Sequence, residues 1–568
     1  MGKKFYVFIA MLAIAVWCSA AGKIKTTLFN AIDRNHIDRV ITKPTFVVNK
    51  NVPEDKTAFI PASIISDNMV LQRNAVNHLW GQTNFDGPFA VEIAGHLFYG
   101  KAKNHSFDIY LAPLRVCNSC LLTFYNDKAK LVIRNVAIGE VFLLSGQSNI
   151  TYAMKDVLHG DQGCSFGVYK PSLAADPETF YTYGKDGDAY QNWNKTVSDK
   201  NKALLEDNSL VRLCMVEDED VYPDKPEVSV PCKWYESNTK TDDASKRVSA
   251  IAYYFAKEMQ HKTGIPVGVV PSSRGGTLVV PWIPMDVYSQ HKDCFYYIGD
   301  ESNAYNLPSK CYNHFIAPIT KYKFKAVIWW QGDGQPIKWV DGMNLLVDSW
   351  RKAFDEKTLP FYVLENDRSG EADTIPADYA KTRITTVNQD EDFGTLDSWP
   401  ECRANVQKLC AQKSFCYYIV NLDTGGYDEC HSSWDKDKVA DRCVKTFFKY
   451  GYGMDMLLSP VIKSLKVTDK GILLTLAHVG KGIVVKNNGR NFDIKIHGVW
   501  KPARAYKMNS NQLIIKARDT KLNASDYEYL RYGYRNFPRI SRRVVWSYLS
   551  VYNSSDMPLD QFIKKINR

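Results

Sequence analysis

The chain has 568 residues, of which 45% are apolar, 24% charged and 13% aromatic. This composition belongs to a folded protein of several domains and excludes a disordered or collagen-like chain. The net charge of +10 is dispersed, and no interior apolar run reaches the roughly 18 residues of a membrane-spanning helix, so we expect no nucleic-acid partner and no membrane span.

The N-terminus has the pattern of a secretory signal peptide over residues 1–20. Two lysines precede an apolar run that ends at Trp17, and small residues follow it. We therefore expect a protein that is secreted or delivered to the endolysosomal lumen; an uncleaved anchor helix is the alternative, for which the run is short. Residues 21–58 are polar without a clear period and are predicted to be a leader segment.

The cysteines agree with an oxidising compartment. Removal of a signal peptide that contains Cys18 leaves twelve of the 13 cysteines, an even number that suits disulfide bonds. Their pairing cannot be read from one sequence. Cys117 and Cys120 form a C-x-x-C pattern, but a metal or redox role is disfavoured because no second such pair exists.

Sequons for N-linked glycosylation begin at Asn104, Asn149, Asn194, Asn523 and Asn553. In a secreted chain such sites accept glycans when they lie on the surface. We expect glycans on all of them except Asn149, which lies inside the nucleophile motif described below, where a glycan would block the chemistry.

Two regions have the pattern of short strands separated by turns, at 59–136 and at 459–568. Turn signals recur about every 8–12 residues in the first of them, which predicts a β-sandwich. The second is predicted to be a β-rich C-terminal region that could pack with the first.

The region between them, 137–458, alternates strands with helices and predicts a parallel α/β sheet. Apolar strand patterns lie at 141–144, 266–270, 324–330, 361–364 and 417–422, and amphipathic helix patterns lie at 244–263 and 435–450. Asp242 or Asp243 is predicted to cap the first helix, and Gly264 to end it.

Polar residues follow four of these strands, where ligands bind in open α/β sheets. Ser145 and Ser148 follow the first strand and are candidate nucleophiles. Gly275 and Gly276 follow the second, and paired glycines let a backbone N–H approach a substrate closely.

The other two strand ends supply an amide and an acid–base pair. Gln331 or Gln335, after the third strand, could donate a side-chain amide to an oxyanion. Asp428 and His431 follow the last strand, and three-residue spacing lets the carboxylate orient the imidazole as a general base. Each motif alone is more often structural; their combination favours a serine hydrolase.

This combination resembles the sialate O-acetylesterase family of the SGNH hydrolases. The resemblance is carried by GEVFLLSGQSNI (139–150), SSRGGTLVVPW (272–282) and AVIWWQGDGQ (326–335), and it extends from about residue 59 to the C-terminus. It implies an α/β fold, namely an SGNH-hydrolase-like parallel sheet flanked by helices with β-rich N- and C-terminal regions. It also implies a metal-independent reaction without a cofactor.

Residue by residue, the resemblance implies a Ser-His-Asp triad. Ser148 matches the nucleophile, His431 the base and Asp428 the orienting acid, with Asp423 as the alternative acid. The implied oxyanion hole consists of the Ser148 N–H, a backbone N–H of the Gly275–Gly276 pair and the side chain of Gln331.

The implied substrate is an O-acetylated sialic acid, whose carboxylate Arg274 could bind. Arg274 and Gln335 depart from the family pattern. An esterase acting on other acetylated glycans, or an inactive carbohydrate-binding member, are therefore the alternatives. Cys430, next to the base, is expected to form a disulfide that stiffens this loop. The oligomeric state and the acetyl position do not follow from the sequence.

Overall fold

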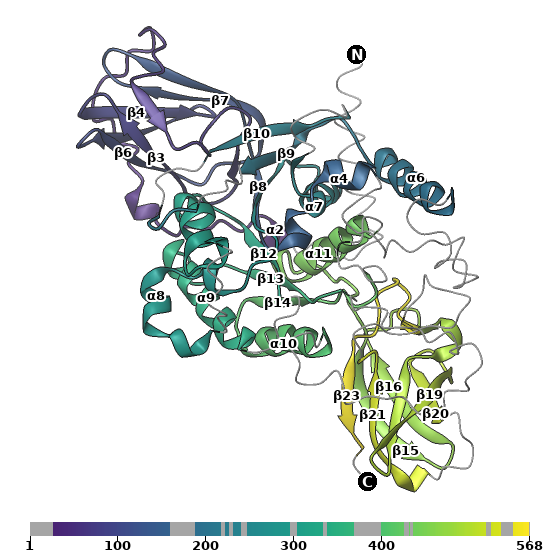
Figure 1. Ribbon diagram of the computed structural model, residues 1–568. Helices are drawn as coiled ribbons and strands as arrows, with labels where there is room; N and C mark the ends of the chain where they lie inside the picture. Colours follow the sequence, from purple (N-terminus) through teal and green to yellow (C-terminus); the bar gives the residue numbers. More distant parts are fainter. Residues whose placement is uncertain are drawn as a thin grey trace, which may run out of the picture.

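The computed structural model describes residues 26–159, 188–216, 222–226, 231–239, 247–295, 304–332, 338–367, 399–424, 431, 435–517, 524–534 and 549–566. Figure 1 shows a central sheet with its helices, and a β-rich region at each of two opposite ends of the molecule. The N- and C-terminal β regions are thus separated by the central sheet, and the suggestion that they pack together is wrong. The predicted signal peptide, 1–20, lies outside the described residues.

The N-terminal region is built of two sheets. Its strands are β1 (Phe59–Pro61), β2 (Val70–Gln72), β3 (Asn77–Thr83), β4 (Gly87–Ile93), β5 (His96–Ala102), β6 (Ser106–Leu111), β7 (Cys117–Tyr125) and the start of β8 (Lys130–Gly146). One sheet has the order β1-β3-β6, and in the other β4 pairs with β5 and β7. The strand pairs of this region are antiparallel except for β2, which pairs with β8 in parallel. Rings of Phe59 and Phe107 from the first sheet contact those of Phe89 and Phe124 from the second, which seals the two layers together.

Two predicted boundaries differ from the structure. Strand β8 runs without a break across the expected boundary between residues 136 and 137, so the β region and the central sheet share a strand. The segment 21–58 is not a loose leader where it is described. It contains α2 (Thr26–Phe29) and a 3-10 turn, and the Phe29 carbonyl accepts a hydrogen bond from Arg73 at 2.8 Å.

The central sheet has the strand order β10-β9-β11-β8-β12-β13-β14. The remaining strands are β9 (Asn208–Val216), β10 (Cys232–Ser237), β11 (Val267–Ser273), β12 (Ala326–Trp330), β13 (Phe361–Leu364) and β14 (Cys416–Ile419). All neighbours from β9 to β14 are parallel, and β10 is an antiparallel edge strand. The strands β11 to β14 lie where the apolar runs predicted them.

Helices cover both faces of this sheet. They are α3 (Ser148–Thr151), α4 (Met154–His159), α6 (Asp188–Ala203), α7 (Ala250–Thr263), α8 (Met285–Gln290), α9 (Trp339–Ala353), α10 (Trp399–Gln412) and α11 (Lys436–Gly451). On one face, Phe142 of β8 contacts Phe255 of α7 and Phe447 of α11. On the other face, Trp329 of β12 contacts Trp350 of α9. Burial on both faces explains why these strands are apolar runs rather than alternating patterns.

Helix α7 begins later than the sequence suggested. Its N-cap is Ser249, whose hydroxyl accepts a hydrogen bond from the Ala252 N–H at 3.3 Å, and neither Asp242 nor Asp243 fills that role. The helix ends at Gly264 in the left-handed conformation (φ 69°), as predicted.

The C-terminal region is an antiparallel sheet with the order β15-β16-β20-β19-β18-β21-β23. Its strands are β15 (Val461–Thr468), β16 (Gly471–Ala477), β18 (Phe492–Ile496), β19 (Val499–Lys507), β20 (Gln512–Ala517), β21 (Tyr527–Tyr532) and β23 (Phe562–Lys565), with a small β17 (Val484–Val485) and β22 (Val551–Tyr552) pair beside them. Leu422, just after β14, is buried in the core of this region. The C-terminal region therefore packs against the segment that leads to His431.

Candidate active site

Ser148 is presented by a sharp turn at the end of β8. A Cβ on Gly146 would lie 2.0 Å from the Trp330 carbonyl oxygen, and φ at Gly146 is 137°, so only glycine fits there. The Gln147 N–H donates to the same Trp330 carbonyl at 3.0 Å. Ser148 then begins α3 and is partly exposed, as a nucleophile must be.

Ser145 has a different role. Its side chain is fully buried, and its hydroxyl donates to the Ser272 carbonyl of β11 at 2.6 Å. This hydroxyl joins two neighbouring strands and cannot meet a substrate. Of the two candidate serines, Ser148 is the one that can.

The glycine pair lies directly beside Ser148. The Arg274 N–H donates to the Gly146 carbonyl at 3.2 Å, which fixes the loop after β11 against the turn after β8. A Cβ on Gly275 would lie 3.4 Å from the Ser148 Cβ. The backbone of Gly275 is therefore as close to the candidate nucleophile as the predicted oxyanion role requires. Gly276, with φ 71°, turns the chain away.

Replacing Gly275 with alanine is expected to reduce kcat/KM for an aryl acetate by about tenfold to 100-fold, because the methyl group lies against the Ser148 Cβ and fills space that the acetyl group needs for attack. The melting temperature is expected to stay unchanged, since φ at Gly275 is not positive and no contact falls below 3.4 Å. Steady-state kinetics and thermal melting measure both. An unchanged kcat/KM would show that Gly275 does not border the reacting centre.

Gln331, the oxyanion donor that the resemblance implied, has both ends of its side chain engaged within the protein. Its side chain is fully buried, its amide N–H donates to the Thr277 carbonyl at 3.0 Å, and its carbonyl accepts from the Trp339 indole at 2.7 Å. It connects β12, the glycine loop and α9. The alternative, Gln335, lies outside the described residues.

Gln147 is a site residue that sequence reasoning missed. Its side-chain oxygen accepts a hydrogen bond from the Gly332 N–H at 3.1 Å, and the side chain is almost fully buried. It ties the turn that carries Ser148 to the turn after β12. Its position between Gly146 and Ser148 in the first motif is the sequence feature that could have identified it as a site residue.

The segment that carries His431 lies against the Ser148 turn. The His431 ring stacks on Tyr152, with centroids 5.9 Å apart and planes 18° apart, and the Tyr152 N–H donates to the Ser148 carbonyl at 2.8 Å. Five residues after His431, the buried Lys436 binds the side-chain oxygen of Asn149 and lies 4.6 Å from the Trp330 ring centroid. The candidate base thus contacts a residue that lies one helical turn after the candidate nucleophile.

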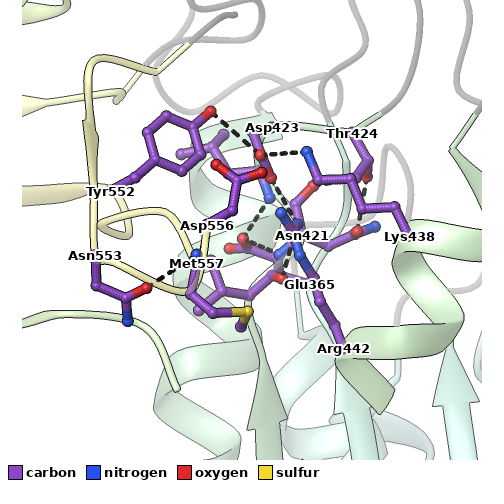
Figure 2. A network of polar contacts seen from close by, with 12 residues as sticks. Glu365, Asn421, Asp423, Thr424, Lys438, Arg442, Tyr552, Asn553, Asp556 and Met557 are labelled. Carbon is purple, nitrogen blue, oxygen red and sulfur yellow. Dashed lines mark hydrogen bonds and ion pairs between the residues drawn. The ribbon is translucent and has the colours of Figure 1, made fainter. Parts of the chain in front are cut away.

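The two candidate acids differ in their surroundings. Asp428 lies outside the described residues. Asp423 is buried and forms ion pairs with Arg442 at 2.6 Å and Lys438 at 2.8 Å, and it accepts a hydrogen bond from the Tyr552 hydroxyl at 3.2 Å (Figure 2). Both of its oxygens are engaged with α11 and the C-terminal region.

The charge state of Asp423 follows from these contacts. Burial alone would raise the pKa of its carboxyl, but the positive charges of Arg442 and Lys438 outweigh burial and hold the pKa far below its usual range. Asp423 therefore remains ionised and serves as the centre of an ion-pair cluster that joins the two regions.

Arg274 directly precedes the glycine pair in the loop after β11. It is partly buried, and its guanidinium carbon is 4.7 Å from the Tyr305 ring centroid and 5.8 Å from that of Tyr222. The Gly276 carbonyl accepts a hydrogen bond from Asn306 at 2.9 Å, which holds the Tyr305 turn beside the loop. Two aromatic rings thus flank a cation next to Gly275.

The asparagines of the five sequons differ in their exposure. Asn104 is exposed in the turn between β5 and β6, whereas Asn523 and the side chain of Asn194 lie outside what the structure describes. Asn149 is fully buried. The prediction for Asn553 is wrong: its side chain is 1% exposed, and its amide donates to the carbonyls of Leu458 at 2.7 Å and His478 at 3.1 Å. A glycan on that nitrogen would disrupt the folded state.

Cys117 and Cys120 are joined by a disulfide bond. Among the described residues the structure places the other cysteines outside disulfide bonds, at positions 214, 232, 294, 311, 402, 410, 416 and 443. The proposed bridge at Cys430 lies outside the described residues. No helix of the described residues has the length and apolar character to cross a membrane.

The region that contains the glycine and glutamine motifs also matches a family of known proteins. Residues 227–390 match the family model "carbohydrate esterase, sialic acid-specific acetylesterase". This range includes Gly275 and Gln331, while Ser148 and His431 lie outside it. No sequence among the curated proteins matches the chain.

Among solved structures, a carbohydrate acetylesterase from Xanthomonas citri has the same fold, with 20% identity and a TM-score of 0.66, over 89% of this chain and 99% of that one. A protein from Arabidopsis thaliana (13% identity, TM-score 0.28, 55% of this chain and 98% of that one) and an acetyl xylan esterase from Butyrivibrio proteoclasticus (10%, 0.23, 72% and 98%) are too distant to support an argument. Residues 227–390 thus carry the likeness to the sialic acid-specific acetylesterase family, and on this match the chain is a carboxylic ester hydrolase.

Proposed function

We propose that this chain is an SGNH-type serine esterase that removes O-acetyl groups from sialic acids or similar acetylated sugars through Ser148, His431 and Asp428. The observation that supports this most is the meeting of three separate segments at Ser148. A Cβ on Gly275 would lie 3.4 Å from the Ser148 Cβ, and His431 stacks on Tyr152, one turn after Ser148. A hydroxyl, a backbone N–H and an imidazole are the groups that acyl transfer needs.

In the proposed reaction, His431 accepts the hydroxyl proton while Ser148 Oγ attacks the acetyl carbonyl carbon. The negative charge that develops on the carbonyl oxygen is stabilised by the N–H groups of Ser148 and Gly275. The sugar alcohol leaves with the proton from His431. Water, activated by His431, then hydrolyses the acetyl-enzyme and restores Ser148. Asp428 keeps the His431 ring in the tautomer that accepts the proton.

The proposed substrate preference rests on Arg274. A guanidinium held between Tyr305 and Tyr222 beside Gly275 is suited to bind the carboxylate of an acidic sugar whose acetyl group is at Ser148.

Replacing Arg274 with glutamine is expected to raise KM for O-acetylated sialic acid by about tenfold to 100-fold, the effect of one lost charge-assisted hydrogen bond. KM for an acetylated neutral sugar is expected to stay unchanged. Acetate release from acetylated glycans with and without sialic acid measures both. If the parent enzyme prefers the neutral glycans, or if both KM values change equally, sialic acid is not the preferred substrate.

The inactive alternative is tested on the same protein. A fluorophosphonate probe is expected to label Ser148, because it reacts with a serine that an adjacent base activates. Glycan binding without labelling would favour a carbohydrate-binding member that has lost catalysis.

We also propose that the chain enters the secretory route and loses residues 1–20. The charged and apolar pattern of the N-terminus supports this, and so does the disulfide between Cys117 and Cys120. N-terminal sequencing of the protein recovered from culture medium or from lysosomes locates both the cleavage site and the compartment.

A further inference from the structure

Two cysteines that are not joined by a disulfide in the structure lie side by side at one edge of the central sheet. In the antiparallel pair of β9 and β10, Cys214 lies opposite Trp234 and Cys232 opposite Val216, so the cysteines are diagonal neighbours on the same face. Both pack into the same hydrophobic core; burial and the neighbouring Cys232 thiol raise the pKa of the Cys214 thiol, and the Cys232 thiol donates a hydrogen bond to the Ser63 hydroxyl at 3.5 Å. The Tyr322 side chain lies next to both.

We propose that Cys214 and Cys232 form a disulfide bond in the mature protein. Diagonal neighbours in a sheet have Cα atoms about 7–8 Å apart, at or just beyond the roughly 7 Å that a disulfide spans without movement of the backbone. Cys232 is the first residue of an edge strand that pairs on one side only, so it can make the remaining small shift.

The chemistry is a thiol–disulfide exchange with a disulfide-bearing oxidant of the secretory route. Cys232, which is partly exposed, attacks one sulfur of the oxidant; the oxidant's disulfide breaks and one of its sulfurs leaves as a thiol. Cys214, which is buried, then attacks the Cys232 sulfur and expels the second thiol. The protein loses two electrons and two protons, and the oxidant gains both.

The bond would join β9 to β10 at the two ends of the connecting segment that contains Tyr222. Tyr222 is 4% exposed, and its carbonyl accepts a hydrogen bond from Lys310 at 2.9 Å. Its ring contacts that of Tyr305 and lies 5.8 Å from the Arg274 guanidinium. By joining the two ends of this excursion, the disulfide would hold Tyr222 against Arg274. This consequence, unlike the bond itself, rests on the proposed function.

Peptide mapping of the full chain from a secreting host tests the bond directly. Free thiols are blocked with iodoacetamide before any reduction. Trypsin leaves both cysteines in one peptide, 213–233, because Lys225 precedes Pro226. We expect this peptide to be unalkylated and two hydrogens lighter than its reduced form. A glutamate-specific protease, cutting after Glu217 or Glu227, is expected to give two fragments that separate only on reduction. Alkylation at Cys214 and Cys232, or a bond from either to another cysteine, would overturn the proposal.

The Cys214→Ser, Cys232→Ser double variant tests the consequence. KM for an acetylated acidic glycan is expected to rise about twofold to fivefold, as for one weakened cation–π contact, while kcat/KM for an aryl acetate stays unchanged. Cys294→Ser, a partly exposed thiol outside this strand pair, is the control and should change neither. If no ester is hydrolysed by any form, the proposed function fails while the mapping result stands. A mapped bond with an unchanged KM would remove only the link to Tyr222.

Discussion

Replacing Ser148 with alanine is expected to lower kcat for aryl acetate hydrolysis by about 10⁴-fold or more, because no other group can form the acetyl-enzyme. Loss of the hydroxyl leaves the oxyanion donors in place, so a small residual rate above that of water should remain. The side chain is partly exposed, and the melting temperature should change little. Steady-state kinetics with an active-site titration measure the loss.

Ser145→Ala is the matched control for this change. Its hydroxyl donates to the buried Ser272 carbonyl, so its loss should lower the free energy of unfolding by about 1–3 kcal/mol. The folded fraction should keep most of its turnover. If Ser145→Ala removes activity from folded protein while Ser148→Ala retains it, the assignment of the nucleophile is reversed.

The two aspartates near His431 are expected to separate activity from stability. Asp428→Asn should lower kcat by about 10⁴-fold without unfolding the protein, because an amide favours the wrong histidine tautomer. Asp423→Asn should instead lower the free energy of unfolding by about 3–5 kcal/mol, because Arg442 remains buried without its ion pair. Denaturant unfolding and kinetics on each variant measure the two effects.

Lys438→Ala is the matched control for the stability loss expected of Asp423→Asn. Lys438, the other cation of Asp423, has a side chain that is 34% exposed, so Lys438→Ala should lower the free energy of unfolding by less than about 1 kcal/mol. If Asp423→Asn is as stable as the parent but inactive, Asp423 is the orienting acid and Asp428 is not.

Acid adds an independent test of Asp423. Because the pKa of its carboxyl is lowered in the folded state, its stabilisation is fully present above the unfolded value of 3.8 and is lost as the pH falls toward the folded value. The melting temperature of the parent protein should therefore fall more steeply than that of Asp423→Asn between about pH 5 and pH 2. Parallel curves would contradict a lowered pKa.

The order of strands and helices in the central region followed from local patterns. A strand buried on both faces must be a short apolar run, and a helix over it must have an apolar stripe, so residues 361–364 and 266–270 were identified by their side chains alone. The start of α7 was misplaced, since Thr241, Asp242, Asp243 and Ser245 are capping types as well as Ser249, which caps the helix.

The motifs at the strand ends predicted which segments meet, because the carboxyl ends of parallel strands lie along one edge of a sheet. These motifs could not predict whether each side chain faces the substrate or the interior of the protein. Gln331 looked like an oxyanion donor, yet Thr277 and the Trp339 indole occupy its amide. Asn553 had a valid sequon, yet its side chain is buried and its amide donates to two carbonyls from segments distant in sequence.

Sequence alone therefore established the class of this protein. It is an ester hydrolase with a central α/β region and β-rich ends, and it has a glycine loop, a serine and a histidine after strands of the central sheet. Those features depend on residues close together in the chain. Tertiary structure distinguished Ser148 from Ser145, made Asp423 an ion-pair centre and brought Cys214 beside Cys232. Each of these depends on partners far away in sequence, whose hydrogen bonds and charges decide whether a polar group faces the substrate or the core.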